Sequence, residues 1–414
     1  MSLTKVVITG AGAVSPYGIG VPVFLQKLFE GRSAIKNMRA EWSEHIEDLM
    51  CYVGAPLPEP LDEQLIPRKF RKTMGRTAML AYFAAEEALK QAGLQDDRLN
   101  NSRVGVSFGS STGSAISTEQ FFVEHMRTKS ARTLPSGIFF QIMSHTSAAN
   151  IAQAFNIKGR VISPNSACSS SAQALGIAFE FIQNGHQDIM VCGGSDELHV
   201  TTSASFDMVQ AASFKYNDQP EKTPRPFDKD RDGTVSAEGA GCLILESEPS
   251  ALQRGAPILG EVVGFSTNSS GVHMAHADVD SIVACMQEAL NNAGLKPGDI
   301  DYINAHATGT LIGDIHEAQA IKEVFSASNV PVSSIKGYFG HTLGASGVLE
   351  VIGVLEMMKT NRILPTRNLE TPDEECKGIH HIQEIQTSKL NTVLKNSFAF
   401  GGINTVIIVK RYEE

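Results

Sequence analysis

The chain has 414 residues, of which 42% are hydrophobic and 19% charged, and its formal net charge is −10. This length predicts two or three structural units with a core that needs no disulfide support, and the acidic balance argues against nucleic-acid binding, which relies on a basic surface. We find no signal peptide and no apolar run long enough to span a bilayer, so we expect a cytoplasmic protein without membrane attachment.

A repeated motif divides the chain into two similar parts. Glu-Ala-Leu, two residues and then Ala-Gly-Leu occur at 87–94 and again at 288–295, an offset of 201 residues (288 minus 87). Each copy ends a segment of helical periodicity at a glycine, as is typical just after a helix C-terminus. A Val/Ile-rich strand precedes each copy, and a β-like run follows it. We therefore predict two related α/β halves, residues 1–255 and 256–414, in one compact unit.

A basic run lies before the first copy of the motif. It contains Arg68, Lys69, Arg71, Lys72 and Arg76 and is unusual in so acidic a chain. Two interpretations stay open at this point. The run is either the solvated start of a helix or a local docking patch for an acidic partner.

One of the six cysteines lies in a turn that favours reactivity. No two cysteines have CxxC spacing, which disfavours zinc and dithiol sites. Residues 161–185 begin as a strand, turn through Pro164 and Asn165, and read as a helix from about Cys168. A helix N-terminus favours an anion, so we expect the pKa of this thiol to fall and a thiolate to be available. The alternative is a small buried thiol that fills the turn.

Two segments resemble metal sites without completing them. Three aspartates within 228–232 match a calcium loop, but the twelfth position is Gly239, where a bidentate glutamate is required. We expect a structural loop there. His273 and His276 could ligate a metal if they lay on one helical face, but their Ser/Gly-rich surroundings predict a loop instead. We expect no metal.

Two histidines in the second half follow short strands. His306 ends a strand, and His341 lies in a Gly-rich turn between Lys336 and an apolar helix that carries Glu350. The ends of strands are where α/β folds place ligands and catalytic groups. The helix start near His341 favours the neutral imidazole, because a cation is repelled there. Each histidine alone is also compatible with a structural role.

A glycine pair follows Phe400 at the end of a later strand. Gly401 and Gly402 permit a backbone conformation that other residues rarely adopt. Such a loop can direct a backbone N–H at a developing oxyanion.

Together these segments resemble one family, the β-ketoacyl-acyl-carrier-protein synthases. The cysteine turn, HATGT, KGYFGHTLGASG and FAFGGIN occur in the family's order, and PRPFDKDRDGTVSAEGAG is similar to a further family signature. The resemblance covers essentially the whole chain. It implies a thiolase-like α/β fold, in which two duplicated halves form a five-layered α/β/α/β/α core. It also implies a dimer and an enzyme that uses no metal or organic cofactor.

The resemblance implies a two-stage reaction. Cys168 accepts an acyl group from a carrier-protein thioester, and His306 and His341 then assist decarboxylation of a malonyl thioester, whose carbanion attacks the acyl chain. The roles implied for other residues are the histidine geometry and charge balance (Lys336, Glu350), the oxyanion hole (the N–H groups of Cys168 and Phe400), the gate (Phe400) and the pantetheine contacts (Thr308, Thr310).

Four positions depart from the family's usual pattern. Ser166 replaces a threonine and Ala307 a glycine. Ala399 stands where glycine precedes the gating phenylalanine, which would restrict the loop if that position needs a positive φ. Thr112 falls where long-chain enzymes carry a bulkier apolar residue, so a different acyl pocket and a specialised polyketide or aryl polyene pathway remain open.

The implied partner is an acyl carrier protein, which is strongly acidic. The candidate docking residues are Arg71, Lys72, Lys129 and Lys215. The resemblance favours a homodimer and leaves open a heterodimer with a subunit of the chain-length-factor type. A non-catalytic chain-length factor is the alternative function, but such proteins typically lack the cysteine that this chain retains at position 168. Thiolases would need a second catalytic cysteine, and the synthase III type an asparagine in place of one histidine.

Overall fold

Each half of the chain builds a sheet with the same arrangement of strands. The computed structural model describes residues 3–130, 132–275 and 278–413. In the first half the strand order is β1 (Val6–Ser15), β8 (Gly239–Ser247), β7 (Ile189–Asp196), β5 (Val104–Gly109) and β6 (Val161–Ile162). In the second half it is β9 (Gly260–Ser269), β16 (Ile403–Lys410), β15 (Thr392–Ala399), β10 (Tyr302–Asn304) and β11 (Pro331–Ser333), with β13 (His380–His381) at the edge.

The pairing directions also repeat. In both sheets the first three strands pair antiparallel and the last two join in parallel. The sheets meet where β1 pairs antiparallel with β9 over residues 6–8. This equivalence confirms the duplication predicted from the repeated motif. The boundary between residues 255 and 256 stays a prediction.

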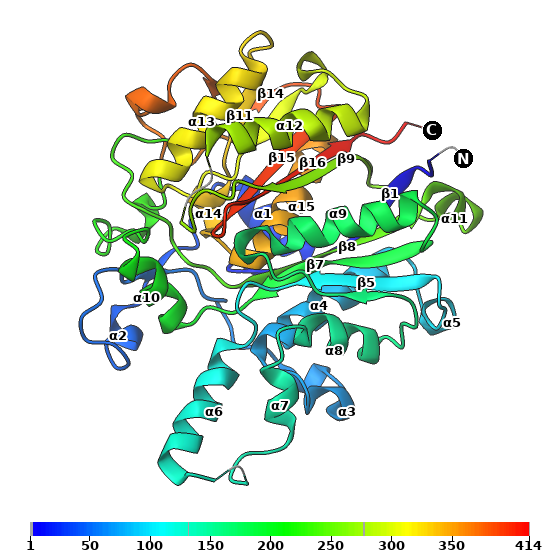
Figure 1. Cartoon of the computed structure of the whole chain (residues 1–414), viewed down its shortest axis with the longest axis vertical. Helices are drawn as coiled ribbons and strands as arrows, with labels where there is room; N and C mark the ends of the chain where they lie inside the picture. The colour runs from blue at the N-terminus through cyan, green and yellow to red at the C-terminus, as the bar shows by residue number, and fades with distance from the viewer. Residues whose placement is uncertain (1–2, 131, 276–277, 414) are drawn as a thin grey trace.

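Helices complete five layers around the two sheets (Figure 1). The outer face of the first sheet is covered by α4 (Arg76–Gln91) and α8 (Thr146–Ala154). Between the sheets lie α9 (Ser170–Gln183) and α15 (Ser346–Thr360), and α12 (Val279–Ala293) and α13 (Leu311–Phe325) cover the outer face of the second sheet. The α/β/α/β/α architecture is therefore confirmed.

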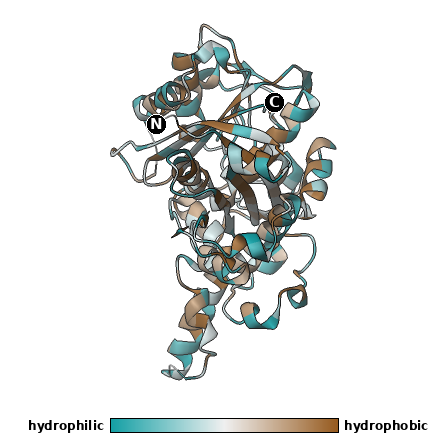
Figure 2. Cartoon of the chain, turned by 90° about the vertical axis from the view of Figure 1, so that its right-hand side faces the viewer, coloured by the Kyte–Doolittle hydropathy of each residue, from teal (hydrophilic) through white to brown (hydrophobic). Residues whose placement is uncertain are grey.

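The two middle helices are apolar on most of their surface, because a sheet packs against each side of them. Most residues of α15 are buried, including Leu349 and Val351, whereas α12 buries one stripe and exposes the other. Figure 2 shows this contrast between brown central segments and mixed outer helices. The two copies of the repeated motif end α4 and α12, and Gly93 and Gly294 follow them with a left-handed φ of 66° each. Both helix ends are as predicted.

The remaining segments connect and extend these layers. The helices α6 (Ala115–Thr128) and α7 (Gly137–Gln141) form an arm that protrudes at the bottom of Figure 1. The other elements are β2 (Gly18–Ile19), α1 (Val21–Phe29), β3 (Lys36–Asn37), α2 (Arg39–Trp42), β4 (Val53–Gly54), η1 (Glu63–Leu65), α3 (Arg68–Arg71), α5 (Asp96–Leu99), η2 (Ala167–Ser169), α10 (Val200–Met208), η3 (Pro220–Lys222), α11 (Glu248–Gln253), η4 (Pro297–Asp299), α14 (Lys336–Phe339), η5 (Leu343–Ala345), β12 (Arg362–Ile363), η6 (Glu374–Cys376) and β14 (Gln386–Thr387).

The calcium-like segment is a structural loop, as predicted. Asp228 accepts hydrogen bonds from the Arg225 guanidinium and from three backbone N–H groups, and Asp232 accepts from Ser213 and two backbone N–H groups. His273 lies in a loop and accepts a bond from the Ala275 N–H, whereas His276 lies outside the described residues. Within the described ranges, no helix combines the length and the apolar character that crossing a membrane requires.

Candidate active site

Cys168 lies in the predicted turn between a strand and a helix. It belongs to the single turn η2, which follows β6 and leads into α9. Ala167 adopts a left-handed φ of 47°, and the Ser170 hydroxyl holds the turn by donating to the Ala167 carbonyl at 2.7 Å. The Cys168 side chain is 7% exposed and lines two cavities. The turn therefore presents the sulfur to space that a substrate can occupy.

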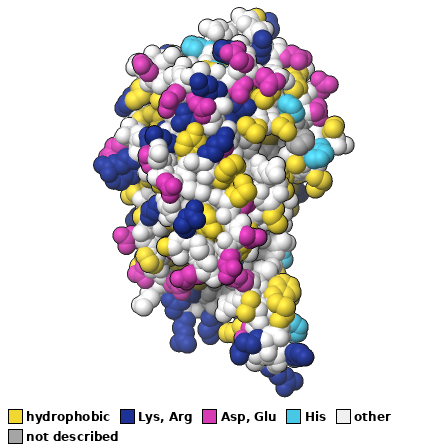
Figure 3. Space-filling model, turned by 90° about the vertical axis from the view of Figure 1, so that its left-hand side faces the viewer, with side chains coloured by type: hydrophobic (Ala, Val, Ile, Leu, Met, Phe, Trp, Pro, Cys, Tyr) yellow, Lys and Arg dark blue, Asp and Glu magenta, His cyan; other side chains and the backbone are white. Residues whose placement is uncertain are grey.

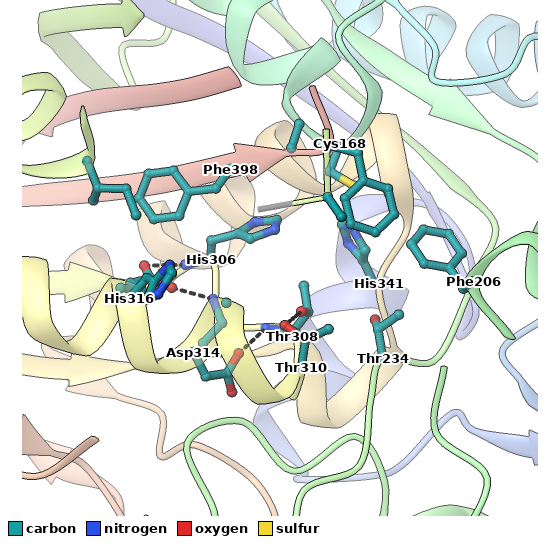
Figure 4. A pocket seen from close by; sticks show the side chains of 17 residues that line it. Cys168, Phe206, Thr234, His306, Thr308, Thr310, Asp314, His316, His341 and Phe398 are labelled. Atoms are coloured by element: carbon teal, nitrogen blue, oxygen red, sulfur yellow. Dashed lines mark hydrogen bonds between the residues drawn. The ribbon is translucent and has the colours of Figure 1, made fainter. Parts of the chain in front are cut away.

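The two predicted histidines lie in the same cavity as this sulfur. His306 follows β10 and His341 lies between α14 and η5, and with Cys168 both line a small cavity of about 80 Å³. The centroids of the two imidazole rings are 5.4 Å apart, with the rings nearly perpendicular. Figure 4 shows both rings near the Cys168 sulfur, and the Phe398 ring lies against His306. Three distant segments therefore meet, as predicted.

Buried hydrogen bonds fix both histidines. The Glu317 carboxylate of α13 accepts the backbone N–H groups of His306 and Ala307, at 2.8 and 2.7 Å. The Asn396 amide of β15 donates to the same carboxylate at 2.9 Å. Nδ1 of His341 is 2.8 Å from the Ser346 hydroxyl, while its Nε2 has no hydrogen-bond partner among the described residues. That nitrogen is available to a substrate.

A buried ion cluster lies beside the histidines. Lys336 and Glu350 are fully buried, and the Lys336 ammonium is 2.6 Å from one Glu350 oxygen. The other oxygen is 2.8 Å from the ammonium of Lys395 on β15. The structure thus pairs the two residues that were assigned to one role and adds a second lysine, which the sequence analysis did not single out.

Burial controls the ionisation of the imidazoles. It lowers the pKa of both His306 and His341 well below the ordinary value, and the positive charge of Lys336 acts in the same direction. The prediction that His341 is neutral is therefore confirmed, although burial, and not the helix start, is the largest cause. In the uncharged form, each ring can donate one hydrogen bond from its N–H and accept one at its other nitrogen.

The expected fall in the thiol pKa is wrong. Burial raises the pKa of Cys168 to about 12 and outweighs the opposing effect of Lys336. Asp196, at the end of β7, adds to this rise. The thiol therefore favours its protonated form at neutral pH in the substrate-free protein.

The loop after β15 has the predicted glycine geometry. Gly401 and Gly402 have positive φ values of 89° and 70°, so the chain turns back at once into β16. Ala399 is an ordinary strand residue that pairs with Ile403, so the alanine imposes no restriction here. The Phe400 ring contacts that of Phe206 with centroids 5.5 Å apart.

Phe400, Phe206 and Cys168 line both cavities. The small cavity also contains Thr308 and Thr310, whose hydroxyls are 3.3 Å apart. The second cavity, of about 640 Å³, contains Thr112 and extends from Cys168 toward α6 and α10. The structure therefore puts the predicted pantetheine residues and the predicted acyl-pocket residue on different sides of the sulfur.

The four candidate docking residues come from three separate segments of the chain. Arg71 and Lys72 are adjacent at the end of α3, where the Arg71 side chain donates to the Glu63 carbonyl. Lys129 is exposed at the C-terminal end of α6, and Lys215 lies in the segment that follows α10. Figure 3 shows Lys and Arg side chains gathered at the end of the molecule that carries the arm. Arg76 of the basic run is already paired within the chain, because its guanidinium forms an ion pair with Glu238 at 2.8 Å.

Three other residues of the site were missed. Lys395 belongs to a quoted segment, but nothing in its spacing indicates a buried charge. Asn396 reads as part of a polar strand end. Asp196 accepts hydrogen bonds from Ser111 and the Gly344 N–H, and so ties the loop beside the second cavity to the turn after His341. The one sequence signal for Lys395 and Asp196 is a charged residue within an otherwise apolar strand pattern.

Comparison with known proteins gives matches over the whole chain. Residues 3–251 match the family model for the N-terminal domain of beta-ketoacyl synthase, and residues 259–370 match that for its C-terminal domain. The 3-oxoacyl-[acyl-carrier-protein] synthase 1 of Haemophilus influenzae is 36% identical over 99% of this chain and 100% of its own. A crystal structure of a beta-ketoacyl synthase from Burkholderia phymatum STM815 superposes with a TM-score of 0.94, at 40% identity over 99% of this chain and 100% of that one. A type II ketosynthase bound to a hexaketide and in complex with its acyl-carrier protein gives 0.91, at 28% identity over the full length of both chains.

Proposed function

The chain belongs to the beta-ketoacyl synthase family, and from this membership we propose that it elongates an acyl chain held on Cys168 with a two-carbon unit from a malonyl thioester. One observation carries the assignment of roles. Cys168, His306 and His341 come from three distant segments and line one cavity. A thiol beside two neutral imidazoles is suited to acyl transfer followed by carbanion chemistry.

In the first stage the sulfur of Cys168 attacks the carbonyl of an incoming acyl thioester. Because the thiol is protonated at neutral pH, its proton must leave during the attack, and a neutral imidazole is the acceptor at hand. The backbone N–H groups of Cys168 and Phe400 stabilise the tetrahedral oxyanion. The carrier thiolate then departs, takes up the proton and leaves a thioester on Cys168.

In the second stage a malonyl thioester occupies the cavity that contains the histidines. Its carboxylate leaves as CO2, and the electron pair moves into the thioester, whose oxygen becomes an enolate. The N–H groups of His306 and His341 donate to that oxygen. For His341, the Ser346 hydroxyl lies 2.8 Å from Nδ1, and when it donates to that nitrogen the ring proton is on Nε2, which has no other partner among the described residues. The carbanion attacks the acyl thioester and expels the Cys168 thiolate, which takes up a proton from solvent as the β-ketoacyl product leaves.

The two cavities suit two different substrate parts. Thr308 and Thr310 line the histidine side, where the pantetheine arm would arrive, and Thr112 lines the side available to the acyl chain. Phe400 borders both, as a gate between acyl and malonyl stages would. Lys336 and Glu350 form a buried ion pair beside the histidines and balance the charge there. This scheme needs no metal or organic cofactor.

The substrates would arrive on an acyl carrier protein in the cytoplasm. The Haemophilus relative is named for such a carrier, and the hexaketide-bound ketosynthase is in complex with one. Arg71 and Lys72 are our docking candidates on α3. We further propose a homodimer, which the exposed apolar side chains of the arm, among them Phe122 and Met126, would support. A heterodimer with a chain-length-factor subunit is the alternative, because one similar structure is a ketosynthase/chain length factor.

A condensation assay tests this function. Acyl- and malonyl-carrier proteins are incubated with the enzyme, and the β-ketoacyl product is measured by mass spectrometry. We expect product with the native chain and none with Cys168→Ala. His306→Ala and His341→Ala should lose condensation, and each should still be acylated because the other imidazole remains to accept the Cys168 proton. A series of acyl donors tests the pathway: strict preference for ordinary medium-length saturated chains would refute a specialised role. Full turnover by Cys168→Ala would refute the assignment itself.

A further inference from the structure

Lys395 is a buried cation with no role in the scheme above. It lies on β15, where it is 1% exposed and pairs in register with Asn304, two residues before His306. Its ammonium is 2.8 Å from Glu350 and 3.2 Å from the Ser397 hydroxyl, and it also donates to the Asn396 carbonyl. A buried lysine is costly and persists only where its charge is paired.

The pleat of β15 divides its residues between two parts of the site. Lys395 and Ser397 point to the same face, toward Glu350 on α15 in the middle layer. Asn396 and Phe398 point to the opposite face, where they contact Glu317 and the His306 ring. Residues of β15 therefore contact the ion cluster on one face of the strand and His306 on the other.

Lys395 adds a second cation to the buried charged groups around the imidazoles. The facing groups are Lys336 at the start of α14, Glu350 on α15 and Glu317 on α13, with Tyr302 of β10 nearby. Burial is the largest cause that lowers the pKa of both imidazoles, and the charge of Lys336 is the next. The positive charge of Lys395 acts in the same direction at both histidines.

We propose that Lys395 is a positioning residue of the active site: it holds Glu350 against Lys336 and adds a second buried positive charge beside the two imidazoles. The inference rests on the proposed function, since the neutral rings matter because one must accept the Cys168 proton. Lys395 acts through other groups and does not touch substrate. Its own pKa is lowered to about 8 by burial, so it carries its charge at neutral pH and loses it in mildly alkaline solution.

The test is the pH profile of acyl transfer from a small pantetheine thioester to Cys168, followed by the mass of the intact protein. Lys395→Met keeps the volume and removes the charge. We expect its acid limb to move to higher pH by roughly one unit, about a tenfold lower rate at a pH on that limb. Above pH 8 the native and variant rates should converge, because Lys395 is then losing its own proton.

A double variant separates charge from packing. Glu350→Gln combined with Lys395→Met removes one charge of each sign, so the acid limb should return toward its native position. Should Lys395→Met fail to fold, Glu350→Gln alone is compared with the double variant, and the acid limb of the double variant should again lie at higher pH. An unmoved limb in a folded Lys395→Met protein, or equal limbs in that second pair, would overturn the inference. Absence of acylation in the native protein would instead contradict the proposed function.

Discussion

The ionisation of the active-site residues follows from their burial. The Cys168 thiol and both imidazoles line a cavity of about 80 Å³, and all three residues are buried. Each group therefore favours its uncharged form, and the thiol gives up its proton only while the sulfur attacks a carbonyl. A reactive anion is thus absent until a substrate arrives.

The histidines should make stability depend on pH. Their pKa values are lowered in the folded chain, so below about pH 6.5 the unfolded chain binds protons that the folded chain does not. The free energy of unfolding should therefore fall as pH drops below 6.5 and level off above it. Each buried histidine contributes up to about 1.4 kcal/mol per pH unit to this slope.

Denaturant unfolding of variants measures that contribution. Raised pKa values of Asp314 and Glu317 act in the opposite sense at lower pH, so the comparison is between proteins and not along one curve. His306→Gln should reduce the slope between pH 6.5 and 5.5, and His45→Gln, on the exposed surface, is the matched control. An identical slope in all three proteins would show that His306 is not held neutral.

Sequence patterns identified the reacting groups and not their electrostatics. Cys168, His306 and His341 each precede or follow a recognisable turn, and the structure brings them together as predicted. The direction of the thiol pKa was wrong because a helix N-terminus is visible in sequence, whereas the depth of burial depends on the packing of two sheets. Lys395 was missed for the same reason: its partner, Glu350, lies 45 residues away (395 minus 350) in another layer.

At the level of single elements, α9 and β15 carry the reacting cysteine and its surroundings into the middle of the molecule. The turn η2, which carries Cys168 and leads into α9, connects directly to β15, since the Ser169 hydroxyl donates to the Ser397 carbonyl at 3.1 Å. Close packing of α9 between the sheets holds this junction. Gly176 is where the helix approaches β9 most tightly, because a Cβ there would lie 2.0 Å from the Phe265 ring.

Gly176→Ala should therefore destabilise the protein. The alanine favours the helix by about 1 kcal/mol, but the clash with a buried ring should outweigh it and leave a net loss of about 1–3 kcal/mol. Thermal unfolding measures the effect, and Gly298→Ala, where an added Cβ meets no neighbour, is the control. The double variant with Phe265→Leu should recover part of the loss. Equal stability of Gly176→Ala and the native chain would contradict this packing.

At the level of the whole molecule, the duplication explains where the site lies. Equivalent strand ends from both halves, β7 and β15, face each other across the middle helices, so each half supplies part of one site. Periodicity and the repeated motif predicted this architecture, because both depend on local sequence. The protruding arm of α6 and α7 was not predicted, since its amphipathic helices read like any surface helix.

The basic residues of α3 should recognise the carrier and not the reacting group. Charge reversal at Arg71 and Lys72 should raise the KM for carrier-linked substrate by about tenfold at low salt, with turnover of small pantetheine thioesters unchanged. Lys389→Glu, on the exposed segment after β14 at the opposite end of the molecule, is the control. Equal losses with both kinds of substrate would reject the docking role.

The most direct measurement is the intact mass of the protein after incubation with an acyl-carrier protein. The account predicts one acyl adduct per native chain, no adduct on Cys168→Ala, and loss of the adduct when malonyl-carrier protein is added. An adduct of equal yield on Cys168→Ala, or a native chain that stays unmodified with every acyl donor, would contradict the claim that Cys168 carries the growing chain.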